Sequence, residues 1–160
     1  MTPKLKKKMS LKQEKRIAKD TDGTLVPLSG ALKTSASWKG DVNTESEKFE
    51  CKITTKEFYV LKFADLSKIR SQALKVGKEP VFLFEFSQGE FKNTYVCLFR
   101  DNGLEPFTTK SLKLYANILY SYSITYSINA PVYKFAYLDK GIERGISIHT
   151  YSDYIKFRNM

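Results

Sequence analysis

The alternation of apolar and polar residues predicts a strand near the middle of the N-terminal half. Over Lys48–Ile53, Phe49 and Cys51 alternate with Glu50 and Lys52. Because successive side chains of a strand point to opposite faces, Glu50 and Lys52 should share one face. The strand would therefore have an apolar face that packs in the core and a polar face that carries an acid and a base.

Longer apolar runs predict further strands. The run that follows Pro80, VFLFEF, is continuous, which is typical of a buried central strand. The segment Phe91–Arg100 reads as its neighbour. Near the C-terminus, Pro131–Leu138 and Gly145–Tyr151 read as a closing hairpin.

Helical spacing predicts a first helix over Leu11–Lys19, with Ser10 as its N-cap. Its inward stripe combines Leu11 and Ala18 with Glu14. An acid between two apolar positions is unexpected unless it has a partner. Glu14 is therefore a candidate site residue, although a half-exposed Glu paired with a nearby Lys is the alternative.

Two further segments have helical spacing. Residues from Asp65 to Val76 carry a clean apolar stripe and end at a glycine, and Gln72 lies beside that stripe. Thr108–Tyr122 also has apolar and tyrosine positions at helical spacing. Its tyrosines would form a core or dimer interface or stack on unpaired bases.

Length and composition indicate the number of domains, the kind of partner and the cellular compartment. A chain of 160 residues fits one domain, 1–160, with residues 1–9 as a basic, flexible arm and 100–160 as a C-terminal extension on the same core. The formal charge of +10 indicates a polyanionic partner, nucleic acid ahead of a membrane surface. No apolar run approaches a bilayer span. Two cysteines and a single histidine cannot form a zinc cluster, and we expect a cytoplasmic, intracellular protein with reduced thiols.

Candidate chemistry gathers around one strand. Asp41 follows a glycine, and Glu50 and Lys52 come nine and eleven residues later. If Asp41 reaches the face that Glu50 and Lys52 share, two carboxylates could bind a hard divalent cation through oxygen. The ammonium beside them would stabilise charge or orient a nucleophile, as phosphodiester hydrolysis requires.

The pattern D-x8-E-x-K that these three residues form resembles the PD-(D/E)xK nuclease superfamily. With SGALKTSASWKGDV before it and FECKITTKEFYVLKFADLSKIRSQALKVGKEPVFLF after it, the segment from about Leu11 to Phe86 is similar to archaeal and phage-type Holliday junction resolvases. The resemblance implies an α/β fold with a restriction-endonuclease-like core, in which a central mixed β-sheet is flanked by helices. It also implies Mg²⁺ (or Mn²⁺ as a substitute), a four-way or otherwise branched DNA substrate and a homodimer, in a protein that a phage could encode.

The resemblance also assigns roles to residues outside the three-residue pattern. Glu14 would complete the metal site with Asp41 and Glu50, and the backbone carbonyl of Cys51 would contribute to it. Gln72 would orient the attacking water.

The basic helix and the small-residue loop before Asp41 are candidates for DNA contacts. Hydroxyls, backbone N–H groups and lysines close to the carboxylates suit the phosphates that flank a scissile bond. An ordinary polar surface loop is the alternative. The candidate contacts are Lys12, Arg16, Ser29, Lys33, Ser35, Ser37 and Lys39.

Two other functions remain open at this point. Restriction, homing and repair nucleases of the same superfamily share the three residues. A non-catalytic DNA-binding accessory protein would have the same basic surface without the chemistry, and it predicts DNA affinity without cleavage.

Overall fold

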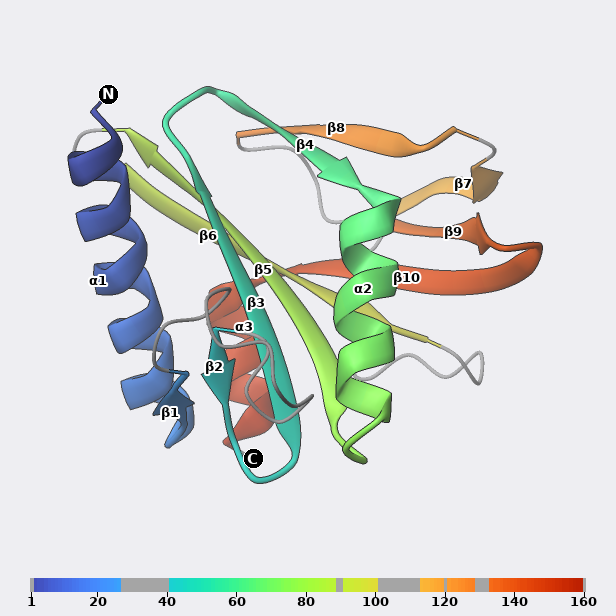
Figure 1. Ribbon diagram of the computed structural model, residues 1–160. Helices are drawn as coiled ribbons and strands as arrows, with labels where there is room; N and C mark the ends of the chain where they lie inside the picture. Colours follow the sequence, from blue (N-terminus) through green and yellow to red (C-terminus); the bar gives the residue numbers. More distant parts are fainter. Residues whose placement is uncertain are drawn as a thin grey trace.

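The computed structural model describes residues 2–26, 41–88, 91–100, 113–119, 121–128 and 133–159 (Figure 1). These residues form three helices, a mixed eight-stranded sheet in the order β1-β2-β3-β5-β6-β10-β9-β7, and a two-stranded ribbon, β4-β8. The helices are α1 (Pro3–Thr21), α2 (Phe63–Leu74) and α3 (Tyr151–Arg158). The strands are β1 (Thr24–Leu25), β2 (Val42–Asn43), β3 (Glu47–Thr54), β4 (Phe58–Lys62), β5 (Glu79–Gln88), β6 (Phe91–Phe99), β7 (Lys113–Leu119), β8 (Ser123–Ser127), β9 (Tyr133–Asp139) and β10 (Ile142–Thr150).

The sheet is mixed because two of its strand pairs run parallel. β3 pairs in parallel with β5, and β7 pairs in parallel with β9, whereas the other described pairs are antiparallel. The connection from β3 to β5 passes through β4 and α2, which suits a parallel pair because its crossover must return along the sheet. The predicted α/β class with a central mixed sheet is confirmed.

Each face of the sheet carries its own core. On one face, α2 and the ribbon cover an aromatic cluster that includes Phe82, Phe84 and Tyr126. On the other face, Phe49 and Cys51 of β3 pack with Ile17 of α1 and with α3. Figure 1 shows α2 in front of the sheet, α3 behind it and α1 along the β1–β3 side. The face of β3 that holds Glu50 and Lys52 is therefore the one toward α2.

The first helix begins earlier than its sequence pattern indicated. Its N-cap is Thr2, whose Oγ1 accepts a hydrogen bond from the Leu5 N–H at 3.2 Å, and Pro3 follows at the first helical position. Ser10 is thus not the cap, and residues 3–9, expected as a flexible arm, form the first turns of α1. A Pro in the first helical turn has its φ preset for the helix, so the start at Thr2–Pro3 has a physical basis.

The prediction of a helix over Thr108–Tyr122 is wrong for the described residues of this segment. Lys113–Leu119 is the strand β7, paired with β9 through register shifts. Tyr122 is 92% exposed and cannot belong to a buried stripe. A tyrosine-rich segment suits a strand as well as a helix. Pairing with β9 therefore decides the structure here, against the helical spacing of the tyrosines. Residues 101–112 and 120 lie outside the described part of the chain.

The remaining predicted elements are confirmed with small shifts. The second helix begins at Phe63, so Asp65 lies in its first turn and does not cap it. The closing hairpin is β9–β10, which turns at Lys140 and Gly141, both with positive φ (51° and 80°). The hairpin extends the same sheet through β10 and β6. Within the described ranges, no helix is both long enough and apolar enough to cross a membrane.

Candidate functional site

The site is built on the strand β3, beside the residue that precedes β2. The Nζ of Lys52 lies 2.8 Å from Oε1 of Glu50, which confirms that the two side chains share a face. Asp41 is fixed to the same strand by two hydrogen bonds: its N–H donates to the Phe49 carbonyl at 2.8 Å, and its Oδ2 accepts from the Cys51 N–H at 2.7 Å. Asp41 and Glu50 therefore belong to neighbouring parts of one strand edge.

The helix α1 brings a third carboxylate to this edge. Its Gln13 is buried and donates from Nε2 to the Lys52 carbonyl at 2.9 Å, while Ile17 packs in the core. Glu14 follows Gln13 and is half-buried beside the strand. The pKa of Glu14 is raised to about 7, first by burial and then by the negative charges of Asp41 and Glu50, while the nearby Lys52 lowers it. The three predicted acids and the predicted lysine thus lie within one electrostatic field.

Lys52 remains a cation in this field. Burial lowers the pKa of Lys52, but the hydrogen bond to Glu50 and the charges of Glu50, Asp41 and Asp65 raise it above its ordinary value. An ammonium that holds its proton acts as a charge stabiliser and not as a general base near neutral pH.

Asp65 is a member of this field that the sequence pattern did not reveal. It lies in the first turn of α2, and its charge acts on both Lys52 and Tyr59. An acid in the first turn of a helix is favourable by itself through the helix dipole, so its sequence position gave no sign of a second role.

Cys51 lies with its side chain on the opposite, apolar face of β3. Burial raises the pKa of its thiol well above the ordinary value, and the charges of Asp41, Glu14 and Glu50 add to the shift. Without a bound metal, the thiol is therefore neutral at neutral pH. The contribution predicted for its backbone carbonyl stays a prediction.

Gln72 is half-buried on α2, seven residues after Asp65. Seven helical residues span about 10 Å along the axis. The first turn of α2 carries the acid that acts on Lys52, and the structure does not link Gln72 to the site through any described hydrogen bond. Its role with the attacking water stays a prediction.

The predicted DNA contacts fall into three groups. Lys12 is exposed on α1. Arg16 forms an ion pair with the buried Glu85 at 2.9 Å and lies over the ring of Tyr151, so it has a structural partner. Ser29, Lys33, Ser35, Ser37 and Lys39 lie outside the described residues.

No three His, Cys, Asp or Glu side chains form a metal-holding group in the described ranges. Among the carboxylates of the site, Asp41 accepts the Cys51 N–H and Glu50 pairs with Lys52. Burial is the largest cause of the raised pKa of Glu14, and the charges of Asp41 and Glu50 add to it, so these acids repel the ionised form of Glu14. A divalent cation would relieve that repulsion, and oxygen donors of this kind suit Mg²⁺.

The raised pKa of Glu14 can be tested by measuring the free energy of unfolding. In a chelating buffer, Glu14→Gln should raise the free energy of unfolding by about 2 kcal/mol at pH 8, with a smaller gain near pH 5. The pKa of Glu14 is raised from 4.5 to about 7. The stability linked to its protonation is complete below the unfolded value and is lost as the pH rises through 7. Urea titrations at several pH values measure the difference.

Glu45→Gln, on an exposed turn, controls for the loss of one negative charge in that experiment. A gain for Glu14→Gln that is independent of pH, or equal to that of Glu45→Gln, would contradict the raised pKa of Glu14.

Comparisons with protein-family models, with curated proteins and with solved structures find no match to this chain. The case for a function therefore depends on the site itself.

Proposed function

We propose that this protein is a metal-dependent DNA endonuclease, and within that class a Holliday junction resolvase. The observation that carries the proposal is that acids and a lysine from three segments influence one another along β3: Asp41 and Glu50 raise the pKa of Glu14, and Glu50 lies 2.8 Å from the ammonium of Lys52. Acids that lie close together repel one another, which lowers the stability of the fold. Groups of this kind, with shifted pKa values, occur preferentially at functional sites.

The order of elements also supports a restriction-endonuclease-like core as part of this proposal. A helix that carries an acid, α1, precedes the antiparallel pair β2–β3. The helix α2 follows, and then β5 pairs in parallel with the E-x-K strand. This order agrees with the resemblance from which the nuclease hypothesis began.

Each residue has a definite role in the proposed reaction. Asp41 and Glu50, assisted by Glu14, would hold Mg²⁺, which when bound supplies Lewis-acid polarisation and a lowered pKa for water. Lys52 donates hydrogen bonds to the charge that develops on the phosphate. Glu14 would add a third carboxylate to this set, and its charge is coupled to those of Asp41 and Glu50.

The proposed substrate follows from the charge and from the symmetry of a junction. The formal charge of +10 favours recognition of backbone geometry over base sequence. Resolution of a four-way junction cuts two opposed strands, so the proposal includes a homodimer with twofold symmetry.

A second candidate is a non-catalytic DNA-binding accessory protein. It is favoured by the direct pairing of Glu50 with Lys52 and by the missing metal-holding group among the described residues. This candidate predicts DNA binding without cleavage at any metal concentration.

A substrate panel separates the candidates. Wild-type protein and Glu50→Gln are incubated with four-way junction, flap, nicked and linear duplex DNA, with Mg²⁺ or with chelator. Paired symmetric nicks on the four-way junction, dependent on Mg²⁺ and absent in Glu50→Gln, are the expected result. Cleavage of linear duplex at a defined sequence would instead favour a restriction or homing enzyme. No cleavage of any substrate would favour the accessory protein.

A further inference from the structure

A basic groove lies between α2 and the β9–β10 hairpin. Its volume is about 680 Å³, and its lining includes five cationic side chains and a single carboxylate, Asp139. The cations are Lys68, Arg70, Lys75, Lys140 and Arg144. Asp139 is itself paired with Arg144, at 3.6 Å from the guanidinium Nε. The lining is therefore strongly positive.

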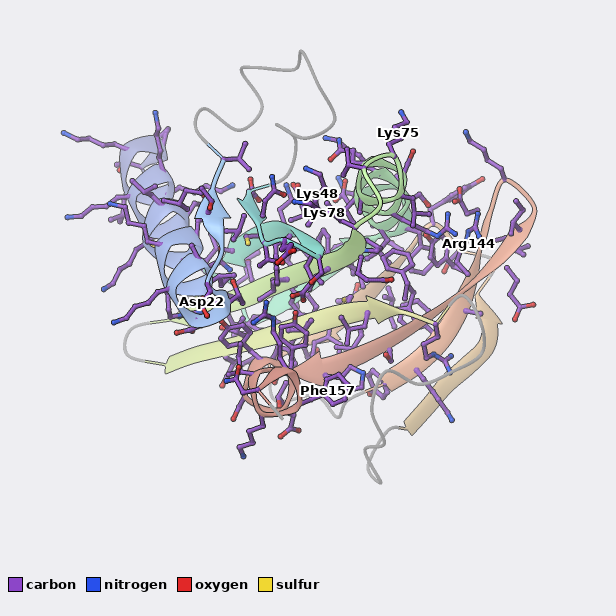
Figure 2. The ribbon with its side chains drawn as sticks, turned by 90° about the horizontal axis from the view of Figure 1, so that it is seen from below. Asp22, Lys48, Lys75, Lys78, Arg144 and Phe157 are labelled. Carbon is purple, nitrogen blue, oxygen red and sulfur yellow. The ribbon has the colours of Figure 1, made fainter. Side chains whose placement is uncertain are left out.

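The groove follows one face of α2. Leu66 and Ile69 are buried against the sheet, whereas Ser67, Lys68, Ser71 and Lys75 turn toward the hairpin. The Oγ of Ser67 lies 2.8 Å from the Tyr137 hydroxyl of β9, a hydrogen bond that fixes the distance between the two walls. Figure 2 shows Lys75 on α2 and Arg144 on β10, on the two sides of this groove.

We propose that this groove binds a phosphodiester backbone of DNA, outside the cleavage site and without regard to base sequence. The inference rests on the proposed function for the kind of partner, but its own evidence is the groove. Small residues, Ser67 and Ser71 among them, line the groove and leave room for a strand. Exposed lysines stand along the rim.

The spacing of the cations fits an extended polyanion. Lys68 and Lys75 are both exposed and are two helical turns apart, about 10 Å. A DNA strand advances about 3.4 Å per nucleotide, so this distance corresponds to about three nucleotides. Leu74 and Ile142 are 47% and 54% exposed beside the cations and can contact the sugar faces. A compact anion would instead require donors that converge on one point.

The helix α2 connects the groove with the proposed cleavage site. Its first turn holds Asp65, which acts on Lys52, and its outer face lines the groove. A branched substrate with one arm near β3 can therefore place a second arm along α2. The groove is formed in part by the C-terminal hairpin, which gives that half of the chain a function.

The test compares Lys68→Gln/Lys75→Gln with a charge-matched control, Lys56→Gln/Lys156→Gln. Both control lysines are exposed, between β3 and β4 and on α3, and neither lines the groove. Binding of fluorescent four-way junction DNA is measured in chelator at several salt concentrations, with poly-glutamate as a second probe.

The groove variant should bind DNA about tenfold more weakly than the control variant. Its slope of log K against log salt should be smaller by about two, one for each lost phosphate contact. Equal affinities and slopes for the two variants would overturn the proposal. Equal loss of poly-glutamate binding would also overturn it, since the groove would then be a general site for acidic polymers.

The outcome is independent of catalysis. If the groove variant loses affinity and no substrate is ever cut, the groove stands and the nuclease proposal fails. If Glu50→Gln abolishes cutting and the groove variant binds like its control, the nuclease stands and the groove fails.

Discussion

Asp41→Asn should reduce cleavage of four-way junction DNA by on the order of 10³-fold while DNA affinity stays the same or rises. The amide oxygen of Asn can still accept the hydrogen bond that the Cys51 N–H donates to Oδ2 of Asp41 at 2.7 Å. The local fold should therefore survive. The negative charge is lost, however, and with it one of the carboxylates proposed to hold Mg²⁺. Single-turnover cleavage with Mg²⁺ and binding in chelator measure the two quantities.

Asp22→Asn is the matched control for this prediction. Asp22 is exposed at the end of α1, where Figure 2 labels it, and its φ of 52° suits Asn as well as Asp. The control should cleave at the wild-type rate. Cleavage by Asp41→Asn at the wild-type rate, in protein that unfolds at the same urea concentration, would refute the proposed role of Asp41.

The E-x-K strand could be predicted because its signal is local. The alternation of Phe49, Glu50, Cys51 and Lys52 assigns each side chain to a face before any partner strand is known. The apolar run after Pro80 likewise indicated a central strand, and it pairs in parallel with β3. Signals of this kind depend on period and burial and not on distant partners.

The errors have the opposite origin. In the segment that contains β7, tyrosines at helical spacing also suit a strand, and pairing with the distant β9 decides between the two. The start of α1 was missed because Thr2 and Pro3 stand before a run of lysines that suggested a tail. In both cases the sequence allowed two structures.

Some residues of the candidate site were singled out from the sequence, and others were missed. Glu14 was singled out as an acid on an inward stripe with Leu11 and Ala18, but this stripe was wrong: Leu11 is 45% exposed, and the buried residues of α1 are Gln13, Ile17 and Thr21. The raised pKa of Glu14 nevertheless shows the influence of Asp41 and Glu50. Asp65 gave no such signal. Glu85 was missed because it lies within VFLFEF, where one acid did not change the prediction of a buried strand. Its partner, Arg16, appeared instead as a candidate DNA contact.

Arg16→Met should lower the free energy of unfolding by about 3–5 kcal/mol. Arg16 donates from Nη1 and Nη2 to the two carboxylate oxygens of Glu85, at 3.4 and 2.9 Å, and from Nη2 to the Thr94 hydroxyl at 3.1 Å. Glu85 is only 2% exposed, so removal of the guanidinium leaves a buried charge without its partner. Urea denaturation measures the loss. Lys12→Met, one turn earlier on the same helix and exposed, should change stability little.

A double variant separates the structural role of Arg16 from a DNA contact. Arg16→Met/Glu85→Leu removes both charges, and it should recover most of the stability because a buried ion pair replaced by apolar side chains is often neutral in free energy. If this variant binds four-way junction DNA as the wild type does, Arg16 acts in the fold alone. Affinity that stays reduced in the stable double variant, by as much as in Lys12→Met, would show that Arg16 also contacts DNA. Failure of the second substitution to restore stability would contradict the ion pair as the cause of the loss.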